Sequence, residues 1–332
     1  MPPKRNRAAV LREWIAKIDG NSVYTTDGRV IFCEPCQQQK ISEIQEKFND
    51  SFYWIMVDET NDKAGRYIAN LIIGKLDGVR FHAPTLIAVK VLERVNSEEI
   101  ARFVNDSIDK YGFNRRKALL IVTDAAAYMK RACVQLKVFY PNMLAVTCVV
   151  HGLHRVAESI REKFPDVDRL IAKTKAIFVK APLRVKLFHE KFPDLALVPK
   201  PVVCRWGTWL DASEYYCQNF RSIKTIVNSF DAKDARCIEE SQACFIDSTW
   251  RNLAYIQSNF SGLSRAITKL EKQGLPIYDA LEIFANVRNE MDAAIGEIAD
   301  QIRNKFNNVV SSNIGLETIA QICQILSGHD TE

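Results

Sequence analysis

The chain has 332 residues, of which 47% are hydrophobic and 26% are charged, with nine cysteines and a formal net charge of +5. This length allows a full hydrophobic core, and no apolar run reaches the ~18 residues of a membrane span, so we expect no membrane segment. The basic start MPPKRNR leads into a stretch interrupted by Arg12, Glu13 and Lys17, which argues against a signal peptide. Scattered cysteines in odd number favour a reducing compartment over a disulfide framework, so we expect an intracellular protein.

Residues 1–50 predict a basic lead, a hairpin and a short helix. The stretch VYTTDGRVIFCEPC alternates around Asp27-Gly28, which is a two-residue hairpin signal, and it ends in Cys33 and Cys36. Such a C-x-x-C pair is the first half of many zinc fingers. No His or Cys follows before His82, so the second pair of ligands is missing. We expect two free thiols or a degenerate finger here, and not a zinc site.

Residues 51–206 predict an α/β domain in which three antiparallel strands precede alternating helices and strands. Short connections between the first three apolar runs favour antiparallel neighbours. Asn96, followed three residues later by Glu99, predicts a capped helix that ends near Tyr111. The predicted strands are FYWIMVD at 52–58, RYIANLIIGKL at 66–76, TLIAVKVLERV at 85–95, ALLIVTD at 118–124 and MLAVTCVV at 143–150. This order is that of the ribonuclease-H-like fold, in which the first and fourth strands lie side by side.

Asp58 and Asp124 each close one of these apolar runs. Carboxylates at the ends of two adjacent strands lie close enough to share divalent metal, which is the basis of two-metal phosphoryl transfer. The alternative is that each Asp is only a turn residue or a helix N-cap, where Asp is common.

The segment from Arg161 to Arg205 contains more basic than acidic residues. Such a bias is typical of a nucleic-acid-binding surface, although solvated helix faces have the same composition. From 207 to 332 the pattern predicts only helices. Apolar residues spaced three and four apart mark a long helix at 253–270, and a second helix is expected from Ile277 through Ile302 after the break at 274–276. The resulting hairpin, 248–308, is either internal core or a surface for partners.

The chain resembles the transposase-derived proteins of the hAT superfamily. The matching strings are MVDETNDKAGRYIANLIIGKL at 56–76, LIVTDAAAYMKRA at 120–132, VTCVVHGLHRVAE at 146–158 and CRWGTW at 204–209. The N-terminal VIFCEPC is also similar, over a shorter stretch, to the BED-type finger of these proteins and to the CGG-triplet-repeat-binding protein. The resemblance implies a ribonuclease-H-like core followed by a helical insertion, and action on DNA through an acidic triad that binds metal.

The resemblance also implies roles for particular residues. Asp58 and Asp124 match the first two catalytic acids and would be the Mg²⁺ ligands. Cys148 and His151 match a C-x-x-H pair that supports the active-site region. Arg205 and Trp206 match an Arg-Trp pair, in which a guanidinium can hold a phosphate and an indole can stack on a base. Lys173, Lys180 and Arg184 are the further candidates for DNA contact.

The chain departs from the family pattern at the third catalytic acid, a glutamate that follows the insertion and has no matching position here. Glu158 is a candidate to replace this third acid, but it belongs to the local HRVAE motif and we expect it to be structural. With one ligand missing, Mg²⁺ would be weakly held. We therefore expect a nuclear DNA-binding protein without strand-transfer activity, which self-associates or pairs with related chains. The alternatives are an active metal-dependent nuclease fragment, or a protein-interaction module that uses the 248–308 hairpin.

Overall fold

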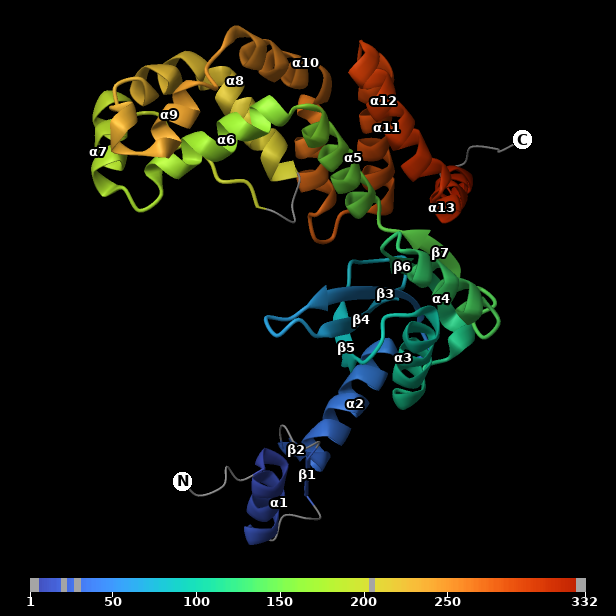
Figure 1. The fold of residues 1–332 in the computed structure, drawn as a ribbon. Coiled ribbons are helices and arrows are strands. Elements are labelled where there is room, and N and C mark those ends of the chain that lie inside the picture. The colour runs from blue at the N-terminus through green and yellow to red at the C-terminus, as the bar shows by residue number, and fades with distance from the viewer. Residues whose placement is uncertain (1–5, 19–22, 27–30, 203–206, 327–332) are drawn as a thin grey trace. The chain divides into compact units, whose positions relative to one another are not determined.

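The computed structural model describes residues 6–18, 23–26, 31–202 and 207–326, drawn in Figure 1. Two compact units are present, Met1–Ala145 and Val146–Glu332. The first contains a mixed sheet with helices, and the second is helical. No single described helix is long and apolar enough to cross a membrane. Two consecutive helices, Glu297–Ser311 and Ile314–Leu326, reach that length and apolarity only when they are combined, and the chain bends by 74° between them.

The N-terminal part of the first unit is a small hairpin between two helices. Its elements are α1 (Arg7–Lys17), β1 (Tyr24–Thr26), β2 (Ile31–Cys33) and α2 (Glu34–Phe48). The two strands are antiparallel, with Tyr24 opposite Cys33, as the alternation predicted. The predicted turn at Asp27-Gly28 lies outside the described residues. Helix α2 starts directly after the hairpin with Pro35 in its first turn, a position where its missing N–H is no loss.

A five-stranded sheet forms the centre of the first unit. Its strands are β3 (Phe52–Asn61), β4 (Tyr67–Leu76), β5 (Thr85–Leu92), β6 (Ala118–Thr123) and β7 (Leu144–Thr147). The spatial order is β5-β4-β3-β6-β7, with β3–β4 and β4–β5 antiparallel and β3–β6 parallel. The first and fourth strands of this sheet are therefore neighbours. The predicted α/β class, with three antiparallel strands and then alternating helices and strands, is confirmed.

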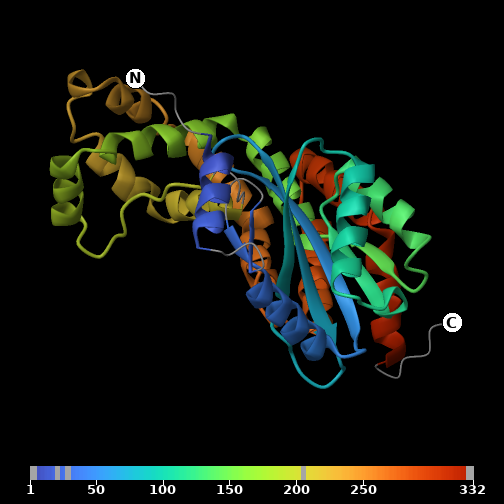
Figure 2. The same cartoon turned by 90° about the horizontal axis from the view of Figure 1, so that it is seen from below.

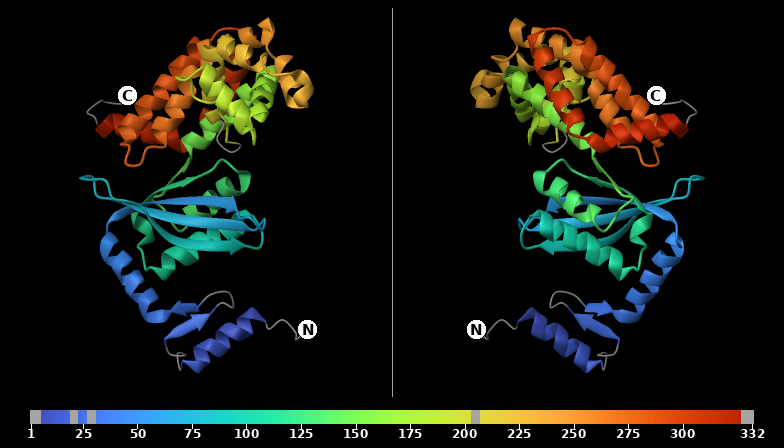
Figure 3. Two further views of the ribbon diagram at one scale, coloured as in Figure 1. Left: turned by 90° about the vertical axis from the view of Figure 1, so that its left-hand side faces the viewer. Right: turned by 90° about the vertical axis from the view of Figure 1, so that its right-hand side faces the viewer.

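One face of the sheet forms the core of the first unit. Tyr53, Ile55 and Val57 alternate along β3 and are buried, because period-two side chains fall on the same face. Helices α2, α3 (Ser97–Lys110) and α4 (Ala127–Lys137) contribute to the same apolar cluster. The helices α3 and α4 lie next to the strands in Figures 2 and 3. The Asn96 side chain accepts a hydrogen bond from the Glu99 amide at 2.9 Å, so the predicted cap of α3 is confirmed.

The second unit is all-helical in the described residues that follow β7, which confirms the predicted helical region. Its longest helices, α8 and α10, pack along each other, and their buried side chains belong to one apolar cluster that includes Trp209, Tyr216 and Phe260. The helices are α5 (Val149–Lys163), α6 (Pro165–Phe178), α7 (Pro182–Lys191), α8 (Gly207–Val227), α9 (Arg236–Gln242), α10 (Asp247–Leu270), α11 (Ile277–Ala293), α12 (Glu297–Ser311) and α13 (Ile314–Leu326), with short 3₁₀ turns at Ala232–Asp234 here and at Arg115–Lys117 in the first unit.

The prediction of one helix from Ile277 through Ile302 was wrong, since two helices occupy this stretch. Helix α11 ends at Ala293, the next residue is extended, and α12 begins after Gly296. Gly296 has φ of 107°, a conformation that residues with a Cβ rarely adopt. The glycine therefore ends the helical run although the apolar spacing continues.

Candidate functional site

The structure places Asp58 and Asp124 at the same end of two adjacent parallel strands. The last aligned pair of β3 and β6 is Met56 opposite Val122, and each aspartate follows two residues later. Because side chains alternate along a strand, both aspartates continue the face that carries Met56 and Val122. Strand β3 itself continues past Asp58 to pair with β4, where Asn70 is opposite Asp58. The register therefore brings the two acids together at the point where β6 ends.

Asp124 also has the local role that the alternative interpretation gave it. Its Oδ1 accepts a hydrogen bond from the Ala126 amide at 3.1 Å, just before α4 begins. Such a bond is typical of an Asp in a turn. One carboxylate oxygen of Asp124 is thus partly engaged by the backbone.

A third carboxylate, Glu59, lies close to the pair and was missed in the sequence. Its Oε2 accepts a hydrogen bond from the Tyr128 hydroxyl of α4 at 2.9 Å. Burial raises the pKa of Glu59, and the negative charges of Asp124 and Asp58 raise it further, while the Tyr128 hydrogen bond opposes the shift. The pKa of Tyr128 is raised as well, first by burial and then by Glu59. Both aspartates thus contribute to the electrostatic environment of Glu59.

The only signal for Glu59 in the sequence is its position next to Asp58. Strand alternation places it on the opposite face, with Val57, where it faces α4. The described part of the chain contains no group of three or more His, Cys, Asp or Glu side chains arranged to hold a metal ion.

The C-x-x-H pair lies at the start of α5. Cys148 occupies the N-cap position and is half-buried, and His151 is exposed in the first turn. His154, one turn further along, has a side chain 14% exposed, with its Nε2 3.4 Å from Oε1 of Glu271. Glu158 is half-buried on the same helix.

Cys33 and Cys36 are neighbours at the junction of β2 and α2. Cys33 is the last residue of the strand, and Cys36 is exposed in the first turn of the helix. A hydrogen bond with Cys33 raises the pKa of the Cys36 thiol. Both are free thiols in the structure.

Several of the basic candidates for DNA contact are engaged within the protein. Lys173 forms an ion pair with Glu240 at 2.7 Å, and Nη1 of Arg184 donates to the Ile177 carbonyl at 3.2 Å. Lys180 is exposed after the end of α6 and has φ of 53°. Arg205 and Trp206 lie outside the described residues.

Trp209 belongs to the core of the second unit. It is 1% exposed, and its Nε1 donates to Oδ1 of Asp168 at 3.0 Å. Asp168 also receives two hydrogen bonds from Arg161, at 2.7 and 3.0 Å. A buried indole that is hydrogen-bonded inside the protein is not available to a base.

The apolar residues of the long helix are also internal. The buried members of the predicted run are Leu253, Ile256, Phe260, Leu263 and Ile267 on α10. They pack against α8 and α11, so this run is core and not a free surface of the 248–308 hairpin.

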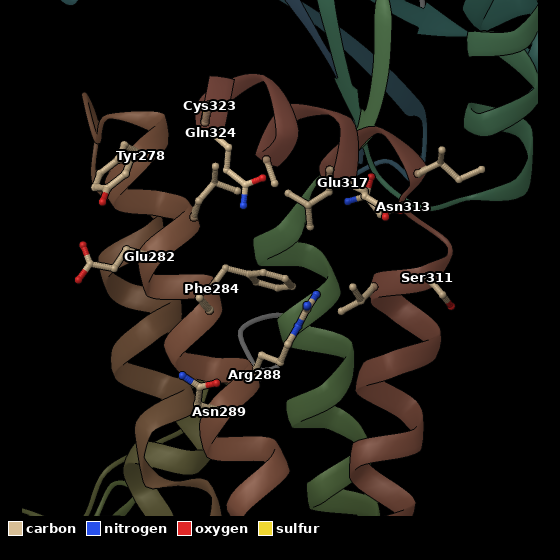
Figure 4. A pocket seen from close by; sticks show the side chains of 16 residues that line it. Tyr278, Glu282, Phe284, Arg288, Asn289, Ser311, Asn313, Glu317, Cys323 and Gln324 are labelled. Carbon is tan, nitrogen blue, oxygen red and sulfur yellow. The ribbon is translucent and has the colours of Figure 1, made fainter. Parts of the chain in front are cut away.

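A groove near the C-terminal end of the second unit has a different character. It is lined by side chains of α11 and α13 and has a volume of ≈ 820 Å³ (Figure 4). Phe284 and Arg288 of α11 extend toward it, and Glu317 lies on α13. Helix α13 buries only Gly315. Its exposed apolar side chains are Ile314 at 78%, Ile322 at 47%, Ile325 at 58% and Leu326 at 82%.

Comparison with known proteins finds a family model that matches part of the chain. Residues 31–177 match the model described as a domain of unknown function (DUF659), a family found in transposase-derived proteins. The match includes both aspartates and the Cys148–His151 pair. No curated protein matches the chain.

Proposed function

We propose that this chain is a nuclear DNA-binding protein derived from a hAT-superfamily transposase, and that it lacks strand-transfer activity. The observation that carries the proposal is the pair Asp58 and Asp124 on one face of adjacent parallel strands, while Glu59 turns to the other face and bonds to Tyr128. This arrangement supports descent from a phosphoryl-transfer site, with two of its acidic ligands among the described residues. The match of residues 31–177 to a domain found in transposase-derived proteins supports the same ancestry.

Asp58 and Asp124 are the residues that would hold Mg²⁺. A bound cation would supply charge stabilisation to a phosphate and orient an attacking oxygen. Mg²⁺ requires near-octahedral coordination, and with two carboxylates, one of them bonded to the Ala126 amide, most of its ligands would be water. We therefore propose weak binding that does not support strand cleavage. Zinc at Cys33 and Cys36 is not part of the proposal, because a structural zinc site needs four ligands.

The attraction to DNA rests on positive charge. The chain has a formal net charge of +5, and its basic residues are concentrated in 161–205. Lys180 is exposed and has no ion pair within the described residues. Contacts between lysine and phosphate release counterions, so affinity should fall steeply as salt rises.

The test is a DNA-binding titration by fluorescence anisotropy across 50 to 200 mM salt, with and without Mg²⁺. We expect an affinity that falls by at least about tenfold over this range and does not depend on Mg²⁺. Asp58→Asn and Asp124→Asn should bind no more weakly than the wild type, because each removes a negative charge. An affinity independent of salt would refute the proposal.

A cleavage assay on supercoiled DNA separates the enzyme alternative. Nicking that requires magnesium or manganese and disappears in both Asp58→Asn and Asp124→Asn would establish a nuclease, completed by Glu158 or by another chain. We expect no nicking above the level of the double variant.

A second function, assembly with another copy of the chain, is favoured by the groove between α11 and α13. We propose that α13 of one copy occupies the groove of the other, because a single two-fold contact would then bury both the apolar groove and the exposed face of the helix. Arg288 lies with its guanidinium over the Phe284 ring, 5.9 Å from the centroid, and pairs with no carboxylate among the described residues. Glu317 likewise has no cation partner there. Arg288 of one copy and Glu317 of the other supply complementary charges.

Sedimentation equilibrium of the full chain tests this assembly. We expect dimers that are weakened by Ile322→Ser and by either Arg288→Glu or Glu317→Arg, with recovery when the two charge changes are combined. Arg251→Glu on α10, which makes the same charge change at an exposed site away from the groove, is the control. A strict monomer at about 100 μM, well above the micromolar range typical of weak specific contacts, would exclude the proposal.

A further inference from the structure

A second pocket of the second unit lies between α6 and the extended segment that ends at Val202. Its volume is ≈ 320 Å³, and it is distinct from the groove of α11 and α13. Two lysines line it, Lys175 from α6 and Lys200 from the extended segment. The side chains of Val179 and Val202 supply apolar wall and are 53% and 48% exposed. The pocket therefore combines two cations with an accessible apolar surface.

Lys175 is held in the pocket by a hydrogen bond to the backbone. Nζ of Lys175 donates to the Val198 carbonyl at 2.8 Å, which fixes the half-buried ammonium beneath the extended segment. An ammonium has three donors, so two remain for a ligand. Burial and the neighbouring charge of Lys200 both lower the pKa of Lys175. The two lysines are thus close enough to repel each other.

No anion of the described residues neutralises this pair. Neither Lys175 nor Lys200 has a carboxylate within 4.0 Å in the described part of the chain. Asp168 also lines the pocket, but its two oxygens already accept hydrogen bonds from Arg161 and from Trp209. Two like charges at the edge of low-dielectric surroundings are unfavourable until an anion joins them. The arrangement therefore favours an anionic ligand.

We propose that Lys175 and Lys200 form a binding site for the phosphate of one nucleotide unit. The ammoniums contact the phosphate as point charges, and the wall at Val179 and Val202 contacts the sugar or base. The inference deepens the DNA-binding function proposed above and rests on it for the source of the phosphate. The same chemistry would also accept a free mononucleotide, which the test distinguishes.

The first test is chemical protection of the full wild-type chain. Amines are acylated with a limiting amount of an N-hydroxysuccinimide ester, and modification at each lysine is measured by mass spectrometry. We expect a single-stranded oligonucleotide to protect Lys175 and Lys200 by at least about fivefold, with little effect at Lys191, which is exposed on α7 outside the pocket. A 5′-mononucleotide should give the same pattern at higher concentration.

Each outcome has a separate meaning. Protection by the mononucleotide without binding to any oligonucleotide keeps the phosphate site and removes the DNA-binding function. Binding to an oligonucleotide that leaves both lysines fully reactive overturns the site and keeps the function. If neither ligand protects the lysines and neither binds, both proposals fail.

The second test compares two charge-matched double variants. Lys175→Gln with Lys200→Gln removes the site, and Lys233→Gln with Lys272→Gln removes the same charge from exposed positions outside both the pocket and the basic segment 161–205. We expect the pocket variant to reduce the slope of log affinity against log salt by about 1 to 2, since each lysine that contacts a phosphate contributes about one. Its affinity should fall about tenfold, and the control should change by less than threefold. Equal losses in the two variants would overturn the site, and far-ultraviolet circular dichroism checks that both remain folded.

Discussion

The contact between Trp54 and Gly74 gives the sharpest prediction about the sheet. The two residues are directly opposite each other on β3 and β4. A Cβ added at Gly74 would lie 2.2 Å from Cε2, 2.3 Å from Nε1 and 2.4 Å from Cζ2 of Trp54. Ordinary contact between carbon atoms needs about 3.5 to 4.0 Å, so Gly74→Ala forces the indole ring to move by more than 1 Å. The glycine is therefore required by the ring that covers it.

The size of the effect follows from two opposing terms. Overpacking of this kind costs about 1 to 3 kcal/mol. Alanine in the middle of a strand is more favourable than glycine by about 0.5 to 1 kcal/mol. We expect Gly74→Ala to lower the free energy of unfolding by about 1 to 2 kcal/mol in the wild type. In a Trp54→Leu background the ring is gone, and the same change should be neutral or stabilising.

The assay is a double-mutant cycle measured by urea unfolding, with far-ultraviolet circular dichroism as the probe because Trp54→Leu alters the fluorescence. We expect a coupling energy of at least about 1.5 kcal/mol between the two positions, within the range of residues in direct contact. If Gly74→Ala costs the same in both backgrounds, the reasoning is refuted, and the glycine serves backbone conformation and not the ring.

Three further predictions concern single contacts. The folded chain raises the pKa of Glu59, so protonated Glu59 favours folding below the unfolded carboxyl pKa and this contribution is lost as pH rises through the folded pKa. The stability of Glu59→Gln relative to the wild type should therefore increase between about pH 4 and 7, by less than about 1 kcal/mol after solvent screening. Urea unfolding across this pH range measures the difference between the two proteins, and a difference that stays constant with pH would contradict the prediction. The Asn313 side chain donates a hydrogen bond to the Thr147 carbonyl at 2.8 Å and accepts one from the Thr147 amide at 3.0 Å. Asn313→Ala should therefore destabilise the folded chain by about 2 to 3 kcal/mol in thermal unfolding. A loss below about 0.5 kcal/mol would show that water replaces both bonds. Trp209→Phe keeps the aromatic packing and removes the bond to Asp168, and we expect a loss of about 1 to 2 kcal/mol in urea unfolding, with no loss arguing that the bond is not needed.

Local patterns were sufficient to predict the sheet and its helices. Short apolar runs predicted the five strands, and the spacing of Asn96 and Glu99 predicted the start of α3, because both signals depend on residues close in the sequence. The adjacency of β3 and β6 followed from the fold that this order matches. The break at Gly296 was missed because apolar spacing describes which side chains are buried and does not report the backbone conformation of one glycine.

The candidate sites depend on contacts that no local pattern contains. The ion pair of Lys173 joins it to Glu240, and the hydrogen bond of Glu59 joins it to Tyr128. These partners lie 67 and 69 residues apart in the sequence, so charge counted along the segment 161–205 could not show which lysines are already neutralised. The convergence of Lys175 and Lys200 was hidden for the same reason. The sequence identified the two aspartates because each closes an apolar run, although β3 continues past Asp58 to Asn61.

The unequal lengths of the strands have a consequence for the motion of the acidic site. Strand β3 is paired on both sides only from Tyr53 to Met56, and from Val57 to Asn61 it is paired with β4 alone. Because β4 is itself paired with β5 here, this half of β3 is the edge of a three-stranded part of the sheet, and its amides that point away from β4 should exchange with deuterium faster than those of the doubly paired half. Asp58 lies just inside this edge half. The strand that carries its carboxylate is therefore held from one side only, which works against any reaction that needs two fixed oxygens.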